Sequence, residues 1–496
     1  MLDLVAKGGK DYLNKNYNHW PNRDWLGGKM LDEEAARQMA FVDKRLANIG
    51  CCGYTIVGDG ASQQSISLIN YYVQTYESGP LYLKSVDCTD HLAEGGEKDA
   101  EYVADGFIDT IKDVGGKPEE GEMKMVKDCV QIVGDGAAVN QAAWRLIEDR
   151  FPWIFCSWCI PHVTNLFFKD CCKQIPEINS IIERAEVINS WFRGHQRPAA
   201  MLSANCFKRY KKTLSLIRPT DTRFGLYFIM IHRLLRVQDG LEDTVKSEEY
   251  LGEGYVDDTA ARYVLDVDFW QRAKALLQIM WPPMLILRFG DSDKPGTSKM
   301  YHYSKQVTKL LEDLEYPGVA LPYGDKVLEL WKGRVGDMLG DIHFAAAALD
   351  PQYHDLKYWE DPRVARGLDA AMQKALMVYE SAEERRAKCI YIAKELEIYK
   401  MKQGVFAYEM TWLSAIELSA AAWWAKYKAE VPTLSWFAQR ITAQVVSSSA
   451  SERGHKANRK VSAKRLLAPR AGCDIIMMNP FACVVCLCLL VPSDVF

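Results

Sequence analysis

The spacing of apolar residues along the chain changes at about residue 50. Before that point, apolar positions recur through DEEAARQMAFVDKRLANIG and stop at Gly50, which predicts a helical lead-in over residues 1–50. After it, the stretches YTIVG, SISLINYYVQT and PLYLKSVDC are rich in β-branched and aromatic residues, and ESGP marks a turn before the third. We therefore expect three consecutive strands in a meander.

Predicted helices and strands then alternate. KDAEYVADGFIDTIKDVG predicts a helix, CVQIVG a strand, AAVNQAAWRLIEDRFP a helix that stops before Pro152, WIFCSWC a short strand, and PHVTNLFFKDCCKQI another helix. A meander of three strands followed by this alternation is the order of a ribonuclease-H-like sheet, whereas a doubly wound sheet alternates from its start. From about residue 178 to 420 strand signals nearly vanish and long amphipathic helical stretches take over.

The predicted fold class is therefore α/β, a ribonuclease-H-like mixed sheet flanked by helices, with a large all-helical unit after it. The expected domains are a lead-in (1–50), the sheet domain (51–178), the all-helical unit (179–420), a C-terminal region (421–470), and an apolar, Cys-rich tail (471–496). A chain of 496 residues exceeds the usual single core, which agrees with this division.

Composition narrows the setting of the protein. A net charge of -4 does not indicate a nucleic-acid binder, although net charge is silent about local patches. The 14 cysteines are scattered and no signal peptide is evident, which favours a reducing, intracellular compartment over a disulfide framework. The apolar run 475–491 is short for a membrane span and contains Asn479 and Pro480, so we expect no membrane partner, with a tail anchor as the alternative.

Two similar stretches carry the candidate chemistry, TIVGDGAS around Asp59 and QIVGDGAA around Asp135. Each aspartate follows a predicted strand, at the end where open α/β sheets place their ligands. Two such carboxylates on adjacent strands offer oxygen ligands for Mg²⁺. The alternative is ordinary turn chemistry, since Gly and Asp both favour turns. Neither stretch fits a phosphate-binding glycine loop.

An ordered set of further segments resembles the hAT superfamily of transposases. The stretch from Val130 to Asp170 is similar to the family core, with Asp135, then Cys159 and His162 as a Cys-x-x-His element, then Asn165-Leu166. RPTDTRFGLYFIMIHRLL resembles its Thr-Arg-Phe block, and LILRFGDSDKPGTSKMYHY and IHFAAAALDPQYH resemble segments of its inserted domain. The Trp-Trp, Pro-x-Leu and SSSASER elements resemble its C-terminal dimerisation region. The resemblance covers about residues 20 to 466. It implies a ribonuclease-H-like core whose first part is 51–178, interrupted by an all-helical insertion domain (179–420) and completed by the C-terminal dimerisation region (421–470).

This resemblance implies a DNA transposase with an Asp-Asp-Glu triad, here Asp59, Asp135 and Glu452, which holds Mg²⁺ or Mn²⁺ for DNA strand cleavage and transfer. It implies DNA as partner, a homo-oligomer and a nuclear location. It assigns Cys159 and His162 to the neighbourhood of the active site and DNA. Dimerisation is expected to involve Trp423, Trp424 and Leu434, and for the tryptophans a role in packing and the dimer core is favoured over base stacking.

Basic residues supply further candidates for contact with DNA. They are Arg223 of DTRF, the run RGHKANRKVSAKR with Arg453, Lys456, Arg459 and Lys460, and the run FKRYKK. Solvated helix faces explain such runs equally well. The spacing of Cys156, Cys159 and His162 is also compatible with a zinc site or a redox pair. A structural zinc site requires a fourth ligand, and no clear one lies nearby in the sequence; a redox pair requires a thiol of low pKa.

Some features depart from the family pattern. Asp59 is followed by Gly60 and Ala61 where the family has Gly-Trp, no BED-type zinc finger precedes the core, and the tail differs. Two hypotheses follow: a metal-dependent strand-transfer enzyme, or a domesticated, non-catalytic protein that binds DNA and dimerises. A pocket enzyme with a small substrate is a third, weaker alternative.

Overall fold

The computed structural model of the protein describes residues 29–47, 49–63, 66–115, 126–219, 225–254, 259–313 and 323–451. The described residues fall into two compact units, which we call the sheet unit and the helical unit. The sheet unit takes in the chain up to Ser157, the short stretch Asp293–Ser298, and the chain from Phe344 onward. The helical unit consists of Trp158–Ser292 and Lys299–His343.

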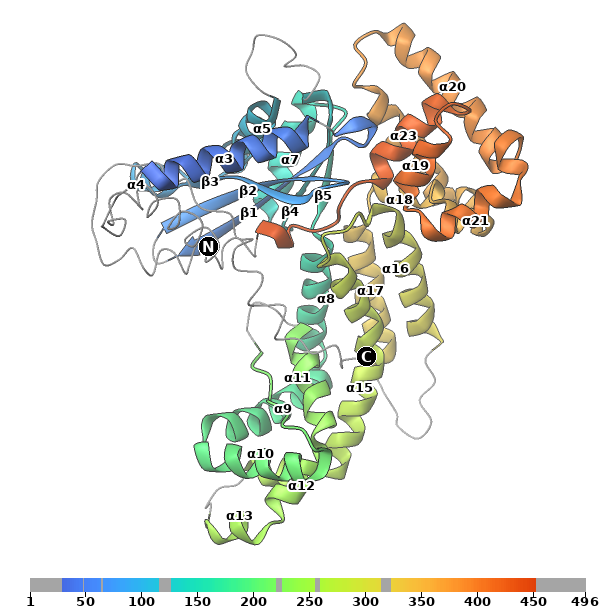
Figure 1. The fold of residues 1–496 in the computed structure, drawn as a ribbon. Coiled ribbons are helices and arrows are strands. Elements are labelled where there is room, and N and C mark those ends of the chain that lie inside the picture. The colour runs from blue at the N-terminus through green and yellow to red at the C-terminus, as the bar shows by residue number, and fades with distance from the viewer. Residues whose placement is uncertain are drawn as a thin grey trace, which may run out of the picture. The chain divides into compact units, whose positions relative to one another are not determined.

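The sheet unit begins with helix α3 and then builds a five-stranded mixed sheet (Figure 1). Its first elements are α3 (Lys29–Leu46), η1 (Gly50–Cys52), β1 (Tyr54–Gln63), β2 (Ile66–Thr75), β3 (Gly79–Asp87), α4 (Thr89–Ala93), α5 (Ala100–Gly115), β4 (Cys129–Gly134), α7 (Ala138–Arg150) and β5 (Phe155–Trp158). The strand order is β3-β2-β1-β4-β5. β1 runs antiparallel to β2 and parallel to β4, and β2 runs antiparallel to β3.

This order, with a meander of three strands followed by helix-connected parallel strands, is the ribonuclease-H-like topology, so the predicted fold class is confirmed. The central strand β4 is buried at all six positions, as expected for a strand covered on both faces. Helices α5 and α7 pack together, and Phe107 of α5 meets Tyr71 of β2 edge-to-face with ring centroids 5.2 Å apart.

The helices from α18 onward belong to the sheet unit. They are α18 (Asp341–Ala348), η2 (Pro351–Leu356), η3 (Tyr358–Glu360), α19 (Pro362–Leu376), α20 (Ala382–Lys400), η4 (Gly404–Ala407), α21 (Glu409–Glu417), α22 (Ala420–Lys426) and α23 (Pro432–Thr442). Residues 344–420, which the sequence assigns to the helical insertion, therefore pack in the same unit as the sheet. An aromatic core packs these helices against one another. Trp424 donates from Nε1 to the carbonyl oxygen of Leu349 at 2.7 Å and packs on Tyr399 of α20.

The helical unit holds the remaining helices. They are α8 (Ile160–Gln174), α9 (Pro176–Gly194), α10 (Gln196–Tyr210), α11 (Gly225–Arg236), α12 (Gln238–Val245), α13 (Glu248–Gly252), α14 (Thr259–Val264), α15 (Val267–Gly290), α16 (Thr297–Glu312) and α17 (Gly324–Met338). Helix α8 is central, since it packs on α15 and on α17, where Phe167 meets Trp331 at 5.3 Å. Among the helices that the structure describes, none is long and apolar enough to cross a membrane.

Candidate functional site

Asp59 lies inside strand β1, not in a turn after it. All ten residues of β1 pair with β2, and Asp59 stands opposite Asn70. The expectation that both Gly-Asp-Gly stretches turn off a strand is therefore wrong for the first copy, because the long hairpin partner β2 keeps the backbone extended through Gln63. It holds for the second copy, since β4 ends at Gly134 and Asp135 leads into α7.

The sheet register brings the two aspartates to one level. In the parallel pairing of β1 with β4, Thr55 matches Gln131 and Val57 matches Val133, an offset of 76 residues. Asp59 and Asp135 have the same offset and lie two residues beyond the last matched pair. Since neighbouring strands lie about 5 Å apart, the two carboxylates start from adjacent positions.

The same level carries polar residues across the rest of the meander. Asn70 pairs with Asp59 on one side and with Ser85 of β3 on the other. The Ser85 hydroxyl donates to Asn70 Oδ1 at 2.5 Å, and Asn70 is fully buried. Ser85, Asn70 and Asp59 therefore form a polar row across β3, β2 and β1, and Asp135, directly after β4, continues it. Asn70 was missed as a site residue, although one amide in the middle of SISLINYYVQT is a visible signal.

The polar row faces away from helix α5. Side chains alternate between the two faces of a strand, so the face that Gly58 presents is the opposite of the face that Asp59 presents. A Cβ atom on Gly58 would lie 2.4 Å from Cζ of Phe107, which shows that Phe107 of α5 covers Gly58 directly. The Gly58 side of β1 is thus filled by α5, and the Asp59 side is left for other groups.

Asp135 is held by the first turn of α7. Its Oδ1 accepts from the backbone N–H of Ala137 at 3.1 Å and from the side-chain amide of Asn140. The same amide also donates to the Asp135 carbonyl oxygen at 3.3 Å. These bonds fix the carboxylate at the start of the helix, where the N-terminal backbone favours negative charge. Both Asp59 and Asp135 are half-buried.

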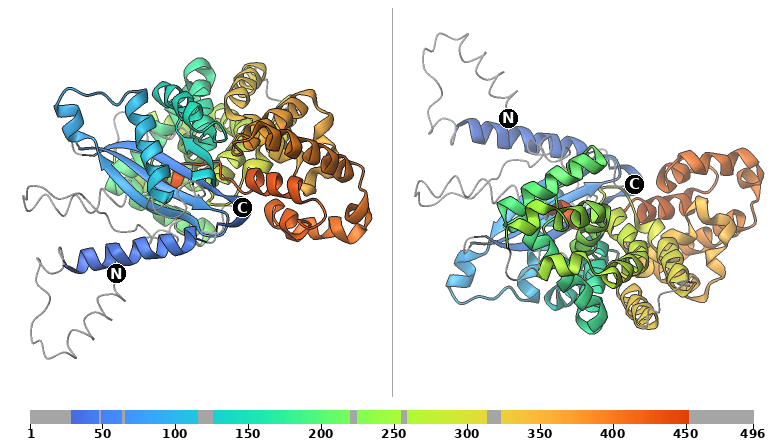
Figure 2. Two further views of the ribbon diagram at one scale, coloured as in Figure 1. Left: turned by 90° about the horizontal axis from the view of Figure 1, so that it is seen from above. Right: turned by 90° about the horizontal axis from the view of Figure 1, so that it is seen from below.

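The segment after α23 returns to this part of the sheet (Figures 1 and 2). It is buried throughout Ala443–Ala450. Gln444 accepts from the Thr55 hydroxyl at 2.8 Å and donates to the carbonyl oxygen of Cys52 at 2.7 Å. Thr55 shares a face of β1 with Asp59, because the two are four residues apart. The segment is therefore fastened beside the face that carries the polar row.

Ser451 is the last residue of this segment that the structure describes. Its hydroxyl donates to the carbonyl oxygen of Asn70 at 3.1 Å, and its side chain is fully buried. Asn70 is the partner of Asp59, so the chain reaches the level of the two aspartates one residue before Glu452. Glu452 itself lies outside the described residues. Sequence reasoning missed Gln444 and Ser451, whose roles depend on contacts hundreds of residues away.

The carboxylate oxygens of Asp59 and Asp135 suit the metal ions that the family resemblance implies. Carboxylate oxygens on adjacent strands are the ligands that Mg²⁺ and Mn²⁺ prefer, and Mg²⁺ keeps several waters, so two aspartates suffice to begin such a site. Within the described ranges no group of three His, Cys, Asp or Glu residues converges to hold a metal. By their chemistry and their neighbouring positions, Asp59 and Asp135 fit as two of the ligands of such an ion.

The Cys-x-x-His element lies in the helical unit at the start of α8. Cys159 is the residue before the helix and has no exposed surface, so its thiol is not placed to contact DNA directly. His162 is half-buried in the first turn. Burial raises the pKa of the Cys156 thiol well above its usual value. A raised pKa disfavours the thiolate that a zinc site or a redox pair needs.

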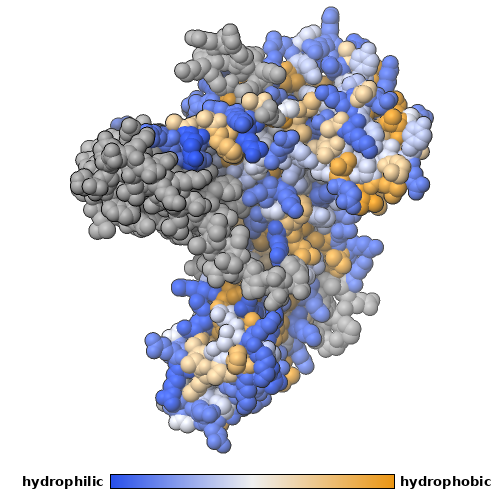
Figure 3. Space-filling view, viewed as in Figure 1, coloured by the Kyte–Doolittle hydropathy of each residue, from blue (hydrophilic) through white to orange (hydrophobic). Residues whose placement is uncertain are grey.

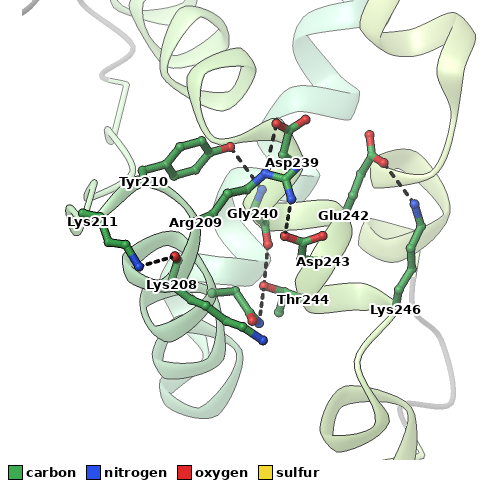
Figure 4. Close-up of polar contacts among 11 residues, drawn as sticks. Lys208, Arg209, Tyr210, Lys211, Asp239, Gly240, Glu242, Asp243, Thr244 and Lys246 are labelled. Carbon is green, nitrogen blue, oxygen red and sulfur yellow. Dashed lines mark hydrogen bonds and ion pairs between the residues drawn. The ribbon is translucent and has the colours of Figure 1, made fainter.

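The basic run at the end of α10 is partly neutralised by its neighbours (Figure 4). Arg209 donates to Asp239 at 3.1 Å and to Asp243 at 2.9 Å, both on α12. On the same helix α12, Glu242 pairs with Lys246. The side chains around FKRYKK therefore do not form a purely positive surface. The other DNA candidates, Arg223, Arg453, Lys456, Arg459 and Lys460, lie outside the described residues.

The residues expected to dimerise are part of the core of the sheet unit. Trp423, Trp424 and Leu434 have no exposed surface. Trp423 donates from Nε1 to the carbonyl oxygen of Thr411 at 2.9 Å, which ties α22 to α21. Side chains that are fully buried within one folded chain do not reach a second copy, so these three residues pack the core of the chain.

The fold and the site define a class before any comparison does: a ribonuclease-H-like domain with two aspartates at one level of β1 and β4. Two family models match the chain, a domain of unknown function called DUF659 at residues 21–188 and the hAT family C-terminal dimerisation region at residues 395–477. Together the two matches support an hAT-family transposase-like protein. The second match supports assembly into homo-oligomers. No curated protein matches the chain.

Proposed function

We propose that this transposase-like protein is a metal-dependent enzyme for DNA strand cleavage and transfer, with Asp59, Asp135 and Glu452 as its triad. The observation that carries the proposal is the common register level of Asp59 and Asp135, with Ser451 fastened to the Asp59 partner Asn70. Three carboxylates from a long hairpin strand, a strand end and a distant C-terminal segment would then meet at one edge of the sheet.

Each residue has a separate task in this proposal. When bound, Mg²⁺ or Mn²⁺ supplies activation of water or a 3′-hydroxyl and stabilises the charge of the phosphoryl transition state. Asp59 and Asp135 supply carboxylates from neighbouring positions of the sheet, and Asn140 fixes the orientation of Asp135. Ser451 positions the backbone that leads into Glu452. The substrate class is DNA, and the place of action is the nucleus.

The test uses the full-length chain and a DNA duplex that carries the terminal repeats of its own element. We expect Mn²⁺-dependent cleavage by the natural protein and a loss of at least 100-fold in Asp59→Asn and Asp135→Asn, because a neutral amide is a poor ligand for these ions. Asp149→Asn is the matched control, since Asp149 is an exposed aspartate on α7. DNA binding by both active-site variants should persist.

Absence of cleavage by the folded natural protein would favour the second function, a non-catalytic protein that binds DNA and dimerises. The missing aromatic after Gly60 is the sequence observation that favours it. In that case Asp135→Asn would leave the cellular phenotype unchanged, whereas a catalytic protein loses its phenotype with the same substitution.

A further inference from the structure

Helix α21 is amphipathic, and its apolar face is turned outward. Its inward positions are Thr411 and Ala415, which are buried. Met410, Leu413 and Ile416 recur every three residues along the opposite face, and their exposed fractions are 71%, 47% and 69%. A soluble chain normally turns polar residues outward on such a short helix, so this face requires an explanation.

Two further apolar side chains extend the exposed surface. Met401 follows α20 and Tyr408 precedes α21, and they are exposed by 65% and 69%. We call these five residues, Met401, Tyr408, Met410, Leu413 and Ile416, the α21 surface. Figure 3 shows hydrophobic side chains gathered over α21.

The α21 surface is held on a firm support. The Thr411 hydroxyl donates to the carbonyl oxygen of Val405 at 2.6 Å, and Trp412 donates from Nε1 to the carbonyl oxygen of Phe406 at 2.8 Å. Gln352 of η2 donates to the carbonyl oxygen of Ala415 at 2.8 Å. Because these bonds fix α21 on the sheet unit, little order has to be gained when its outer face is covered.

The family match identifies what covers this face. The dimerisation region spans residues 395–477, and within its described part, up to residue 451, the exposed large apolar side chains are the five of the α21 surface. Trp423 and Trp424 of the same region are fully buried in the core of the chain. A region that joins two copies needs exposed apolar groups at the centre of its contact, and only the α21 surface supplies them within these described residues.

We propose that the α21 surface is the contact between two copies of this chain, packed face to face about a two-fold axis. A two-fold contact places the same patch on both copies, which suits a self-complementary apolar face. Tyr408 and Met410 are the expected anchors, since aromatic residues and methionine are enriched in such contacts. The proposal rests on the homo-oligomeric assembly in the proposed function and is independent of catalysis.

The test measures the dimer dissociation constant of the full-length chain by sedimentation velocity over a range of concentrations. We expect Met410→Glu and Ile416→Glu each to raise that constant at least tenfold, and the double variant to be a monomer, because each places a charge in the apolar centre of the contact. Val267→Glu is the matched control, since Val267 is 67% exposed on α15 and lies outside the dimerisation region.

The outcomes separate the possibilities. Folded variants of α21 that stay as dimeric as the natural chain would overturn the proposal and move the contact to another part of the region. A natural chain that is monomeric at all concentrations would overturn the homo-oligomeric assembly as well, whereas the DNA cleavage assay judges the triad separately. Equal weakening by Val267→Glu would also contradict the proposal, because the effect would then be general to exposed charges.

Discussion

Gly58→Ala should destabilise the protein although it adds a single methyl group. Its Cβ would lie 2.4, 2.9 and 3.3 Å from three ring carbons of Phe107, whereas unstrained carbon atoms approach to about 3.5–4.0 Å. Phe107 is 3% exposed and packs against Tyr71, so its ring has little room to move. Overpacking of this kind costs about 2–3 kcal/mol of unfolding free energy.

The assay is thermal unfolding followed by calorimetry. A loss of this size lowers the melting temperature by roughly 4–12 °C, given about 2–4 °C per kcal/mol for a domain of this size. Gly60→Ala is the matched control on the other side of Asp59. A Cβ there has nothing closer than 3.9 Å, so it should leave stability unchanged or raise it by up to about 1 kcal/mol.

A second arm ties the loss to the ring of Phe107. In a Phe107→Leu background the ring carbons are gone, and the penalty for Gly58→Ala should shrink by at least about 1 kcal/mol. Two results would refute this explanation: a melting temperature of Gly58→Ala equal to that of the natural protein, or an equal loss of unfolding free energy with and without the Phe107 ring.

The remaining predictions concern the two cores. Trp424→Phe should lower the free energy of unfolding by about 2–4 kcal/mol, measured by urea unfolding, because it removes buried volume and the hydrogen bond to the Leu349 carbonyl oxygen. Trp153→Phe is the control and should lower it clearly less, because the Trp153 indole N–H makes no hydrogen bond among the described residues. Burial lowers the pKa of His343 from 6.5 to about 4. The neutral imidazole therefore contributes its full stabilisation above pH 6.5 and loses it as the pH falls toward 4. The free energy of unfolding should fall by about 3 kcal/mol across this range. His343→Asn, which keeps an acceptor for the Gly340 N–H, should flatten that part of the stability profile, and an unchanged slope would contradict the assignment.

Local patterns predicted the sheet well because strand formation here depends on local composition. The runs YTIVG, CVQIVG and WIFCSWC correspond to β1, β4 and β5, and the meander followed by alternation gave the topology. The end of β1 was not predicted, since Gly58-Asp59-Gly60 has the composition of a turn. Pairing with the ten residues of β2 decides that Asp59 is in a strand, and that partner is a tertiary fact.

The site was predicted in part for a similar reason. Asp59 and Asp135 can be predicted as candidates from the Gly-Asp-Gly motifs that follow apolar runs, and the sheet register then places them at one level. The roles of Gln444 and Ser451 depend on Thr55 and Asn70, which no local window contains. A packing role for Trp423 and Trp424 was predicted, but the partners that enclose them, such as Tyr399 and Phe406, were not, because they come from other elements.

The hydrogen bond between Thr55 and Gln444 joins residues that are 389 positions apart. On a ribosome that adds about 5–20 residues per second, Thr55 waits roughly 20–80 s before its partner is synthesised. During that time β1 and β2 exist without the segment that closes their open face. A nascent or prematurely terminated chain thus has its two aspartates without the fastening that leads to Glu452. The proposed catalytic centre therefore cannot be completed until translation of the messenger RNA is nearly finished.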